Sequence, residues 1–232
     1  MELLSINNKN WAAFSTAVME KCTSLLDVFL VPGTIHSLLA PVFGALVFVA
    51  LLETQTVWIV FWGGKCISAY ASASFHLYCG GKNREEYEDH GKRIRHSIDL
   101  FAVYVNVAST GAICLRKNAS TFLNVNIAFA LLVIPAILCN HRKLRLPLQT
   151  THAICMLLLI GSNTDHPLLF ECMCGFQVFG FACFLLSILY QNWRLHGVFH
   201  LVQLLSDTTL IALMIHSEWY AHFPAKTVWQ YE

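Results

Sequence analysis

The sequence predicts an all-α fold, a seven-transmembrane helix bundle, and three observations carry this prediction. Of the 232 residues, 56% are hydrophobic and only 12% are charged, whereas roughly a quarter of the residues of a soluble domain are charged. Seven apolar windows are each close to the roughly 20 residues that a helix needs to cross a bilayer. Short connections such as Glu53-Thr54 and Asp165-His166 separate some of them, as in an up-and-down bundle.

Each window is justified by its apolar content and by how few charges interrupt it. The first, fourth and fifth windows hold no charged residue, and the second, third, sixth and seventh hold one each. The fifth is the weakest, because it is short and begins with a polar run, and we expect Pro147 to open it, since proline suits the first turn of a helix. In chain order the windows are 33–52, 55–79, 98–115, 120–139, 147–163, 167–190 and 197–217.

The flanking segments complete the expected organisation around one membrane domain at residues 33–217. Residues 1–32 lack a signal peptide and carry apolar side chains at helical spacing, which favours a cytosolic amphipathic segment in the interface. A loosely ordered tail is the alternative for this segment. Residues 218–232 are expected to form a short tail on the outer side.

Lysine and arginine residues in the connections predict the orientation. The N-terminal segment and the second, fourth and sixth connections hold eleven of these residues, whereas the other side holds Arg116, Lys117 and Lys226. Because cytosolic connections are enriched in positive charge, we expect a cytosolic N-terminus and an extracellular or lumenal C-terminus. This direction is opposite to that of rhodopsin-like receptors, whose Asp-Arg-Tyr and Asn-Pro-x-x-Tyr motifs are also missing.

Five polar residues fall at the expected cytosolic ends of three windows. Ser72 and His76 are four residues apart at the end of the second window, and Asp99 opens the third. His196 and His200 are four residues apart at the start of the seventh, so each pair occupies one helix face. Isolated charges and unpaired polar groups are costly in a bilayer. The common depth of these five residues therefore indicates a functional site.

These residue types are the components of a hydrolytic zinc site. The imidazoles of His76, His196 and His200 can bind Zn²⁺ tetrahedrally and leave a fourth position for water, whose pKa the metal lowers toward about 7. Asp99 can then act as general base and acid, and Ser72 can orient the water or hydrogen-bond a developing oxyanion.

Other interpretations of the histidines stay open. The three candidate ligands can instead line a wet cavity, or bind haem iron, which takes one imidazole from each of two facing helices. The remaining histidines of the windows are expected to be ordinary buried residues of the core; they are His36, His152 and His216.

A polar stripe continues from the candidate zinc site toward the middle of the membrane. Lys65 lies eleven residues before His76, and Asp207 lies seven residues after His200, which returns each to nearly the same helix face. We expect Lys65 and Asp207 to pair, either for stability or as part of a substrate pocket. The expected pocket residues are Lys65, Asn106, Gln203 and Asp207.

The combination of Ser-x-x-x-His, Asp and His-x-x-x-His across seven helices resembles the CREST superfamily of membrane metal-dependent hydrolases, and locally its PAQR and haemolysin III branch. The sequence departs from that branch after the aspartate, where Leu100-Phe101-Ala102 replaces the usual aromatic-Gly pair. The segments that carry the resemblance are Ser72-Ala-Ser-Phe-His76-Leu-Tyr, Lys92-Arg-Ile-Arg-His-Ser-Ile-Asp99 and His196-Gly-Val-Phe-His200.

The resemblance implies a cytosol-facing Zn²⁺ and a membrane lipid as substrate or ligand. It implies that His76, His196 and His200 bind the metal, with Ser72 and Asp99 beside it. Relatives include alkaline ceramidases, so the first expected function is hydrolysis of a lipid amide or ester such as ceramide. A PAQR-type receptor or sensor with a mainly structural zinc, and a haemolysin III-like membrane-perturbing protein, are the alternatives. Nothing in the sequence indicates nucleic-acid binding.

Overall fold

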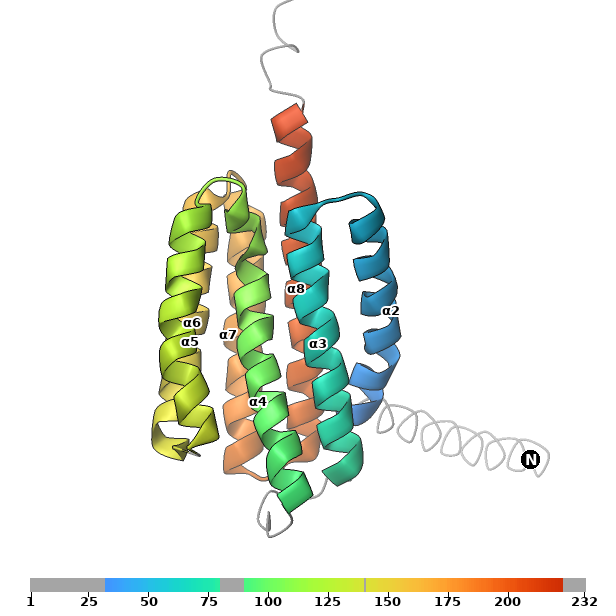
Figure 1. Cartoon of the computed structure of the whole chain (residues 1–232), viewed down its shortest axis with the longest axis vertical. Coiled ribbons are helices and arrows are strands. Elements are labelled where there is room, and N and C mark those ends of the chain that lie inside the picture. The colour runs from blue at the N-terminus through green and yellow to red at the C-terminus, as the bar shows by residue number, and fades with distance from the viewer. Residues whose placement is uncertain (1–31, 80–89, 140, 223–232) are drawn as a thin grey trace, which may run out of the picture.

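The structure is a computed structural model that describes residues 32–79, 90–139 and 141–222. Within these residues the chain forms seven α-helices and one short 3-10 helix (Figure 1), which confirms the predicted all-α, seven-helix fold for this part of the chain. The expected amphipathic segment lies outside the described residues, except for Pro32. The elements are α2 (Pro32–Leu52), α3 (Thr56–Cys79), α4 (His90–Thr110), η1 (Gly111–Leu115), α5 (Ala119–Leu138), α6 (Arg142–Asn163), α7 (Pro167–Leu189) and α8 (Trp193–His222).

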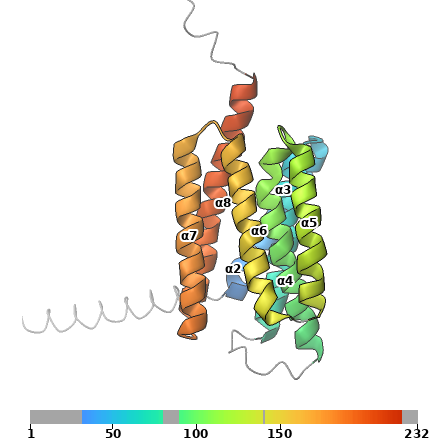
Figure 2. The same ribbon diagram turned by 90° about the vertical axis from the view of Figure 1, so that its left-hand side faces the viewer.

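Six of these segments are long and apolar enough to cross a membrane, which indicates an integral multi-pass membrane protein. The remaining helix, α3, is long enough but less apolar, because glycine, serine, Lys65 and His76 interrupt it. Figures 1 and 2 show α3 aligned with the other helices inside the same bundle, and its polar residues Lys65 and Ser72 are buried. The six candidate spans are Gly33–Leu52, Ile94–Leu115, Ala119–Leu138, Lys143–Asn163, Pro167–Leu189 and Trp193–Ser217.

The helices run alternately up and down, so their ends divide the bundle into two poles. Helix α3 ends, and α2, α4 and α8 begin, at the lower pole of Figure 1. We call this pole the histidine end, because His76 lies in the last turn of α3 and His196 lies near the start of α8.

The helical segments extend beyond the predicted windows most clearly at three places. Helix α4 begins at His90 instead of Asp99, α6 begins at Arg142 instead of Pro147, and α8 continues to His222 beyond the window that ends at 217. The windows follow only the apolar part of each helix. The charged ends can continue the helix, because lysine and arginine side chains reach water while the backbone stays hydrogen-bonded within the helix.

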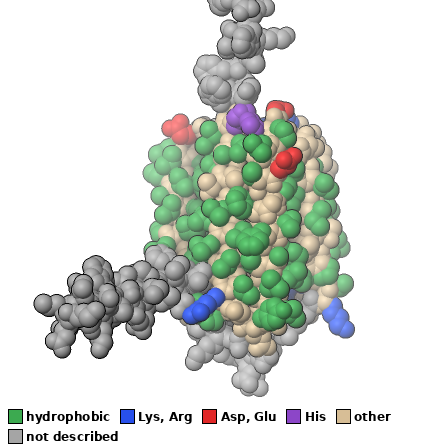
Figure 3. Space-filling model, turned by 180° about the vertical axis from the view of Figure 1, so that it is seen from behind, with side chains coloured by type: hydrophobic (Ala, Val, Ile, Leu, Met, Phe, Trp, Pro, Cys, Tyr) green, Lys and Arg blue, Asp and Glu red, His purple; other side chains and the backbone are tan. Residues whose placement is uncertain are grey.

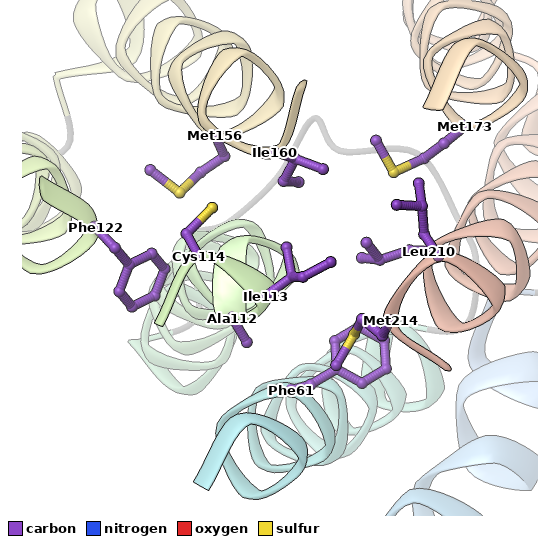
Figure 4. Packing of buried hydrophobic residues seen from close by; sticks show 11 residues of the cluster. Phe61, Ala112, Ile113, Cys114, Phe122, Met156, Ile160, Met173, Leu210 and Met214 are labelled. Carbon is purple, nitrogen blue, oxygen red and sulfur yellow. The ribbon is translucent and has the colours of Figure 1, made fainter. Parts of the chain in front are cut away.

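The apolar core lies at the end opposite the histidines. It joins one aromatic ring of α3 to the 3-10 helix and to the adjoining ends of α5, α6, α7 and α8 (Figure 4). Its best-buried members are Phe61, Ala112, Ile113, Cys114, Phe122, Met156, Ile160, Met173, Leu210, Leu213 and Met214. The polar residues of the sequence motifs are therefore segregated from the main hydrophobic packing.

The outer surface matches a membrane environment. Figure 3 shows hydrophobic side chains across the middle of one face, with lysine and arginine near its lower edge and acidic side chains near its upper edge. Large apolar residues such as Leu131 and Leu158 are about 70% exposed (71% and 69%). In water such a surface would mark an interaction site, whereas acyl chains solvate it in a bilayer.

Glycine allows α3 and α4 to approach closely. A Cβ atom placed on Gly64 would lie 2.2 Å from the Cβ of Ser109 and 3.2 Å from the carbonyl oxygen of Val105. Small residues at such contacts are typical of membrane helices, which gain van der Waals packing when their backbones come together. The neighbouring Gly63 has no atom within 4 Å of the equivalent position.

We expect Gly64→Ala to lower the free energy of unfolding by about 1–3 kcal/mol, because the added methyl group overlaps Ser109 and separates the helices. Gly63→Ala is the matched control and leaves the thermal unfolding temperature in detergent nearly unchanged. Adding Ser109→Gly to Gly64→Ala removes the overlap and recovers part of the loss. Equal effects of Gly64→Ala and Gly63→Ala would contradict the close approach.

Candidate metal centre

Three histidine side chains from two helices meet at the histidine end. One ring nitrogen from each of His76, His196 and His200 lies within 4.8 Å of the other two, which makes this the one group among the described residues that could hold a metal ion. The ring centroids are 5.3 Å apart for His76 and His196, 5.8 Å for His76 and His200, and 4.7 Å for His196 and His200. All three side chains are partly buried.

The spacing of these nitrogens suits a small tetrahedral cation. The Nε2 atoms of His196 and His200 are 3.1 Å apart, and two imidazole nitrogens on one tetrahedral zinc are about 3.4 Å apart, given Zn–N bonds of about 2.0–2.1 Å. A ring nitrogen of His76 lies within 4.8 Å of a ring nitrogen of each of the other two histidines. A haem would need a wide flat space between two imidazoles, whereas these three rings contact one another.

The register of α3 against α8 brings the histidines to one level. Lys65 on α3 donates a hydrogen bond to the carboxylate of Asp207 on α8, with 2.5 Å between Nζ and Oδ1. His76 lies eleven residues after Lys65, and His196 lies eleven residues before Asp207. The helices are antiparallel, and eleven residues are close to three whole turns. His76 and His196 are therefore expected to lie about 16 Å from the ion pair along the helices, on the same helix faces as Lys65 and Asp207.

The ion pair itself confirms the predicted pairing of Lys65 with Asp207. Both side chains are largely shielded, with 4% and 14% of their surfaces exposed. The ammonium group of Lys65 also lies 3.4 Å from the hydroxyl oxygen of Thr110 and 5.4 Å from the ring centroid of Phe61. A buried charge with several partners avoids the cost of an unpaired ion, and here the partners join α3, α4 and α8.

Ser72 and Asp99 lie toward the histidine end, on α3 and α4. Ser72 is buried, one turn deeper than His76, and Asp99 is partly buried. Helices α3 and α4 are antiparallel and touch at Gly64 and Ser109. Ser74 lies ten residues after Gly64, and Asp99 lies ten residues before Ser109. The two residues are therefore at the same level of the bundle. The catalytic roles of Asp99 and Ser72 stay predictions.

Two contacts hold the start of α4 against the end of α3. Arg95 donates a hydrogen bond of 2.7 Å from Nη1 to the hydroxyl of Ser74. The rings of Phe75 and His96 pack with centroids 5.2 Å apart. Asp99 lies one turn after Arg95, so these contacts fix the level of its backbone.

Of the other expected pocket residues, Gln203 belongs to a polar seam between α7 and α8, and Asn106 lies on α4. Gln203 donates to the side-chain oxygen of Gln177 at 3.0 Å, and Gln177 donates to the hydroxyl of Ser206 at 2.8 Å. Asn106 differs, because its buried Oδ1 atom has no hydrogen-bond partner among the described residues. Sequence reasoning missed Gln177, which lies on α7 without a motif around it.

His36 is the residue of this region that the sequence analysis misplaced. It was expected to be a core residue, yet its Nε2 atom lies 3.1 Å from Nδ1 of His200, and its ring stacks on that of His76 with centroids 6.2 Å apart. The available signal was its depth: His36 is the fourth residue of the first window, which begins at the same end at which the second window finishes.

The other two histidines differ from each other. His152 is a fully buried core residue, as predicted: its ring lies between those of Tyr104 and Phe129, and its Nε2 atom is 2.9 Å from the side-chain oxygen of Asn126. His216 is partly exposed and pairs with His166 at the end opposite the candidate metal centre, with ring centroids 4.0 Å apart.

Comparisons with protein-family models, curated proteins and solved structures found no match to this chain.

We expect the protein purified in detergent to bind about one Zn²⁺ per chain, and His200→Ala to lose it, because two imidazoles alone hold the metal weakly. His216→Ala is the matched control, since this histidine lies at the other end of the bundle, and it retains the metal. Elemental analysis after dialysis measures both. Iron with a Soret band, or zinc retained by His200→Ala, would contradict the three-histidine centre.

We expect Lys65→Met to lower the free energy of unfolding by about 3–5 kcal/mol, because it leaves the carboxylate of Asp207 buried without its partner. The double variant Lys65→Met/Asp207→Leu removes both charges and recovers most of that loss. Thermal unfolding in detergent compares the two. If the double variant is no more stable than the single one, the two side chains are not energetically coupled.

Proposed function

We propose that this protein is a membrane-embedded, zinc-dependent hydrolase that acts on a lipid amide or ester. The single observation that supports the proposal most strongly is the convergence of His76, His196 and His200 at one end of a bundle of candidate membrane spans. A bilayer protein retains several imidazoles at such a position at a considerable cost. A metal ion that binds the imidazole nitrogens offsets this cost and gives the three histidines a function.

The donor set favours a catalytic zinc over a structural one. Structural zinc sites generally use four protein ligands, often cysteines, whereas catalytic sites use three and leave one position open. The candidate group holds three histidines and no cysteine among the described residues. When bound, Zn²⁺ supplies Lewis acidity and makes water acidic enough to ionise near neutral pH.

Asp99 and Ser72 are proposed to carry the proton transfers and the orientation of the reacting groups. Asp99 accepts a proton from the attacking water as general base and then donates it to the leaving amine or alcohol as general acid. Ser72 donates a hydrogen bond to the oxygen that becomes negative in the transition state. Ser72 lies on α3, the helix of His76, and Asp99 lies on the neighbouring helix α4, which supports their assignment.

A lipid is the proposed substrate because the site combines an apolar exterior with a polar seam. Acyl chains suit the exposed leucine, isoleucine and phenylalanine side chains of the bundle. The unpartnered Oδ1 atom of Asn106 is a hydrogen-bond acceptor for an amide N–H or a hydroxyl group of the substrate. Lys65, Gln203 and Asp207 complete the proposed pocket, and the resemblance to the CREST superfamily supports a ceramide-like lipid.

The proposed orientation puts the histidine end in the cytosol. Arg95, Lys143 and Arg194 belong to helix ends at this pole, whereas Arg116 and Lys117 belong to the opposite one. The sequence carries further lysines and arginines in the segments that precede α2 and α4, and an excess of positive charge is expected on the cytosolic side.

A receptor or sensor with a structural metal is the second candidate. The Lys65–Asp207 pair favours it, because the same two helices that would share the metal are already joined by a buried ion pair. In that case the metal is a second link between α3 and α8. The seam then serves stability, and no lipid is hydrolysed.

We expect Asp99→Asn to retain zinc and to lower lipid hydrolysis by about 10²–10⁴-fold, the usual contribution of general acid–base catalysis. The zinc-loaded protein in lipid nanodiscs is incubated with a panel of ceramides, other lipid amides and lipid esters, and products are quantified by mass spectrometry. Asp165→Asn is the matched control, because Asp165 is an exposed aspartate near the opposite end.

Three outcomes distinguish the candidates. Turnover in the wild type that is lost in Asp99→Asn and kept in Asp165→Asn supports the hydrolase. Bound zinc without turnover of any lipid in the wild type supports the receptor or sensor. Turnover that is unchanged in Asp99→Asn contradicts the role proposed for Asp99.

A further inference from the structure

We infer that His36 is a positioning residue of the metal centre: it accepts a hydrogen bond from Nδ1 of His200 and thereby directs Nε2 of His200 toward the metal. The inference rests on the proposed zinc site, and it adds a residue from α2 to a centre otherwise built from α3 and α8. No motif considered in the sequence analysis includes His36.

The two nitrogens of the His200 ring have different neighbours. Its Nε2 atom lies 3.1 Å from Nε2 of His196, another of the candidate ligands. Its Nδ1 atom lies 3.1 Å from Nε2 of His36. The rings of His36 and His200 meet edge to face, with centroids 4.4 Å apart and an angle of 82° between their planes.

The packing of α2 against α3 brings His36 to this position. A Cβ atom on Gly33 would lie 3.1 Å from Cδ2 and 3.3 Å from the backbone nitrogen of Leu77, so glycine permits a close approach one residue after His76. His36 follows Gly33 by three residues and therefore occupies the same face of α2. Its ring is nearly parallel to that of His76, with 6° between the planes.

The chemistry of a metal-bound imidazole explains why such a neighbour matters. An imidazole that binds a metal through Nε2 carries its remaining proton on Nδ1 and is a hydrogen-bond donor there. Neutral His36 with its own proton on Nδ1 offers the lone pair of Nε2 to that donor. Partners of this kind fix the tautomer and the ring orientation of the ligand, and their removal typically costs 10- to 100-fold in metal affinity.

Metal affinity of three variants tests the inference. In His36→Phe an aromatic ring of similar size remains but the acceptor is lost, and we expect zinc affinity to fall about 10- to 100-fold. In His36→Gln the side-chain oxygen can accept the same hydrogen bond, so most of the affinity is retained. His216→Phe removes a histidine from the pair at the opposite end and leaves affinity unchanged. Competition with chromophoric chelators measures each dissociation constant in detergent.

The visible spectrum of the Co²⁺-substituted protein gives a second measurement that does not depend on turnover. We expect the d–d bands of His36→Phe to shift relative to wild type, because the His200 ring is no longer held, and those of His36→Gln to stay close to wild type. Thermal unfolding of the metal-free proteins controls for folding, since all three variants are expected to unfold near the wild-type temperature.

Each result decides the inference. Wild-type affinity and spectrum in His36→Phe would overturn the role of His36 while leaving the three-histidine centre intact. Equal loss in His36→Gln and His36→Phe would show that His36 acts by packing and not through its hydrogen bond, which also overturns the inference. A wild-type protein that binds neither Zn²⁺ nor Co²⁺ would instead contradict the proposed function, and this inference with it.

Discussion

The ion pair between Lys65 and Asp207 is the interaction on which the arrangement of the site depends. Neither charge is tolerable alone at such burial, so α3 and α8 must take the register in which the two side chains meet. That register also determines the level of His76 against His196, because both lie eleven residues from the pair toward the same end. A slip of one residue between the helices would displace the imidazoles by about 1.5 Å and rotate them away from a common point.

The main hydrophobic core and the candidate metal centre lie at opposite poles of the bundle. Methionine, isoleucine and leucine side chains fill the bundle at the end opposite the histidines. Polar side chains occupy the seam between α7 and α8. Close packing at Gly64 and Gly33 holds α3 against α4 and α2. The closely packed apolar pole thus supplies most of the hydrophobic burial, and the residues at the other pole are proposed to serve metal binding.

The features that follow from helical periodicity and from the cost of burying polar groups could be predicted from the sequence. Apolar length predicted the seven helices, and equal depth together with helical spacing predicted that His76 would meet the pair on α8, and Lys65 would meet Asp207. The start of α4 at His90 was missed, because charged residues continue a helix without raising its hydropathy. His36 was missed because a lone histidine carries no spacing signal. Its place beside His200 depends on the close approach of α2 to α3 at Gly33 and Leu77, which only the packed helices reveal.

Three imidazoles from two membrane helices are proposed to bind one divalent metal ion. X-ray absorption spectroscopy of the zinc-loaded protein in detergent tests it most directly, because it counts the ligands and measures their distances at the metal. The account predicts three imidazole nitrogens and one lighter oxygen ligand at about 2.0–2.1 Å. Fewer than three imidazoles, or sulfur at about 2.3 Å, would contradict it.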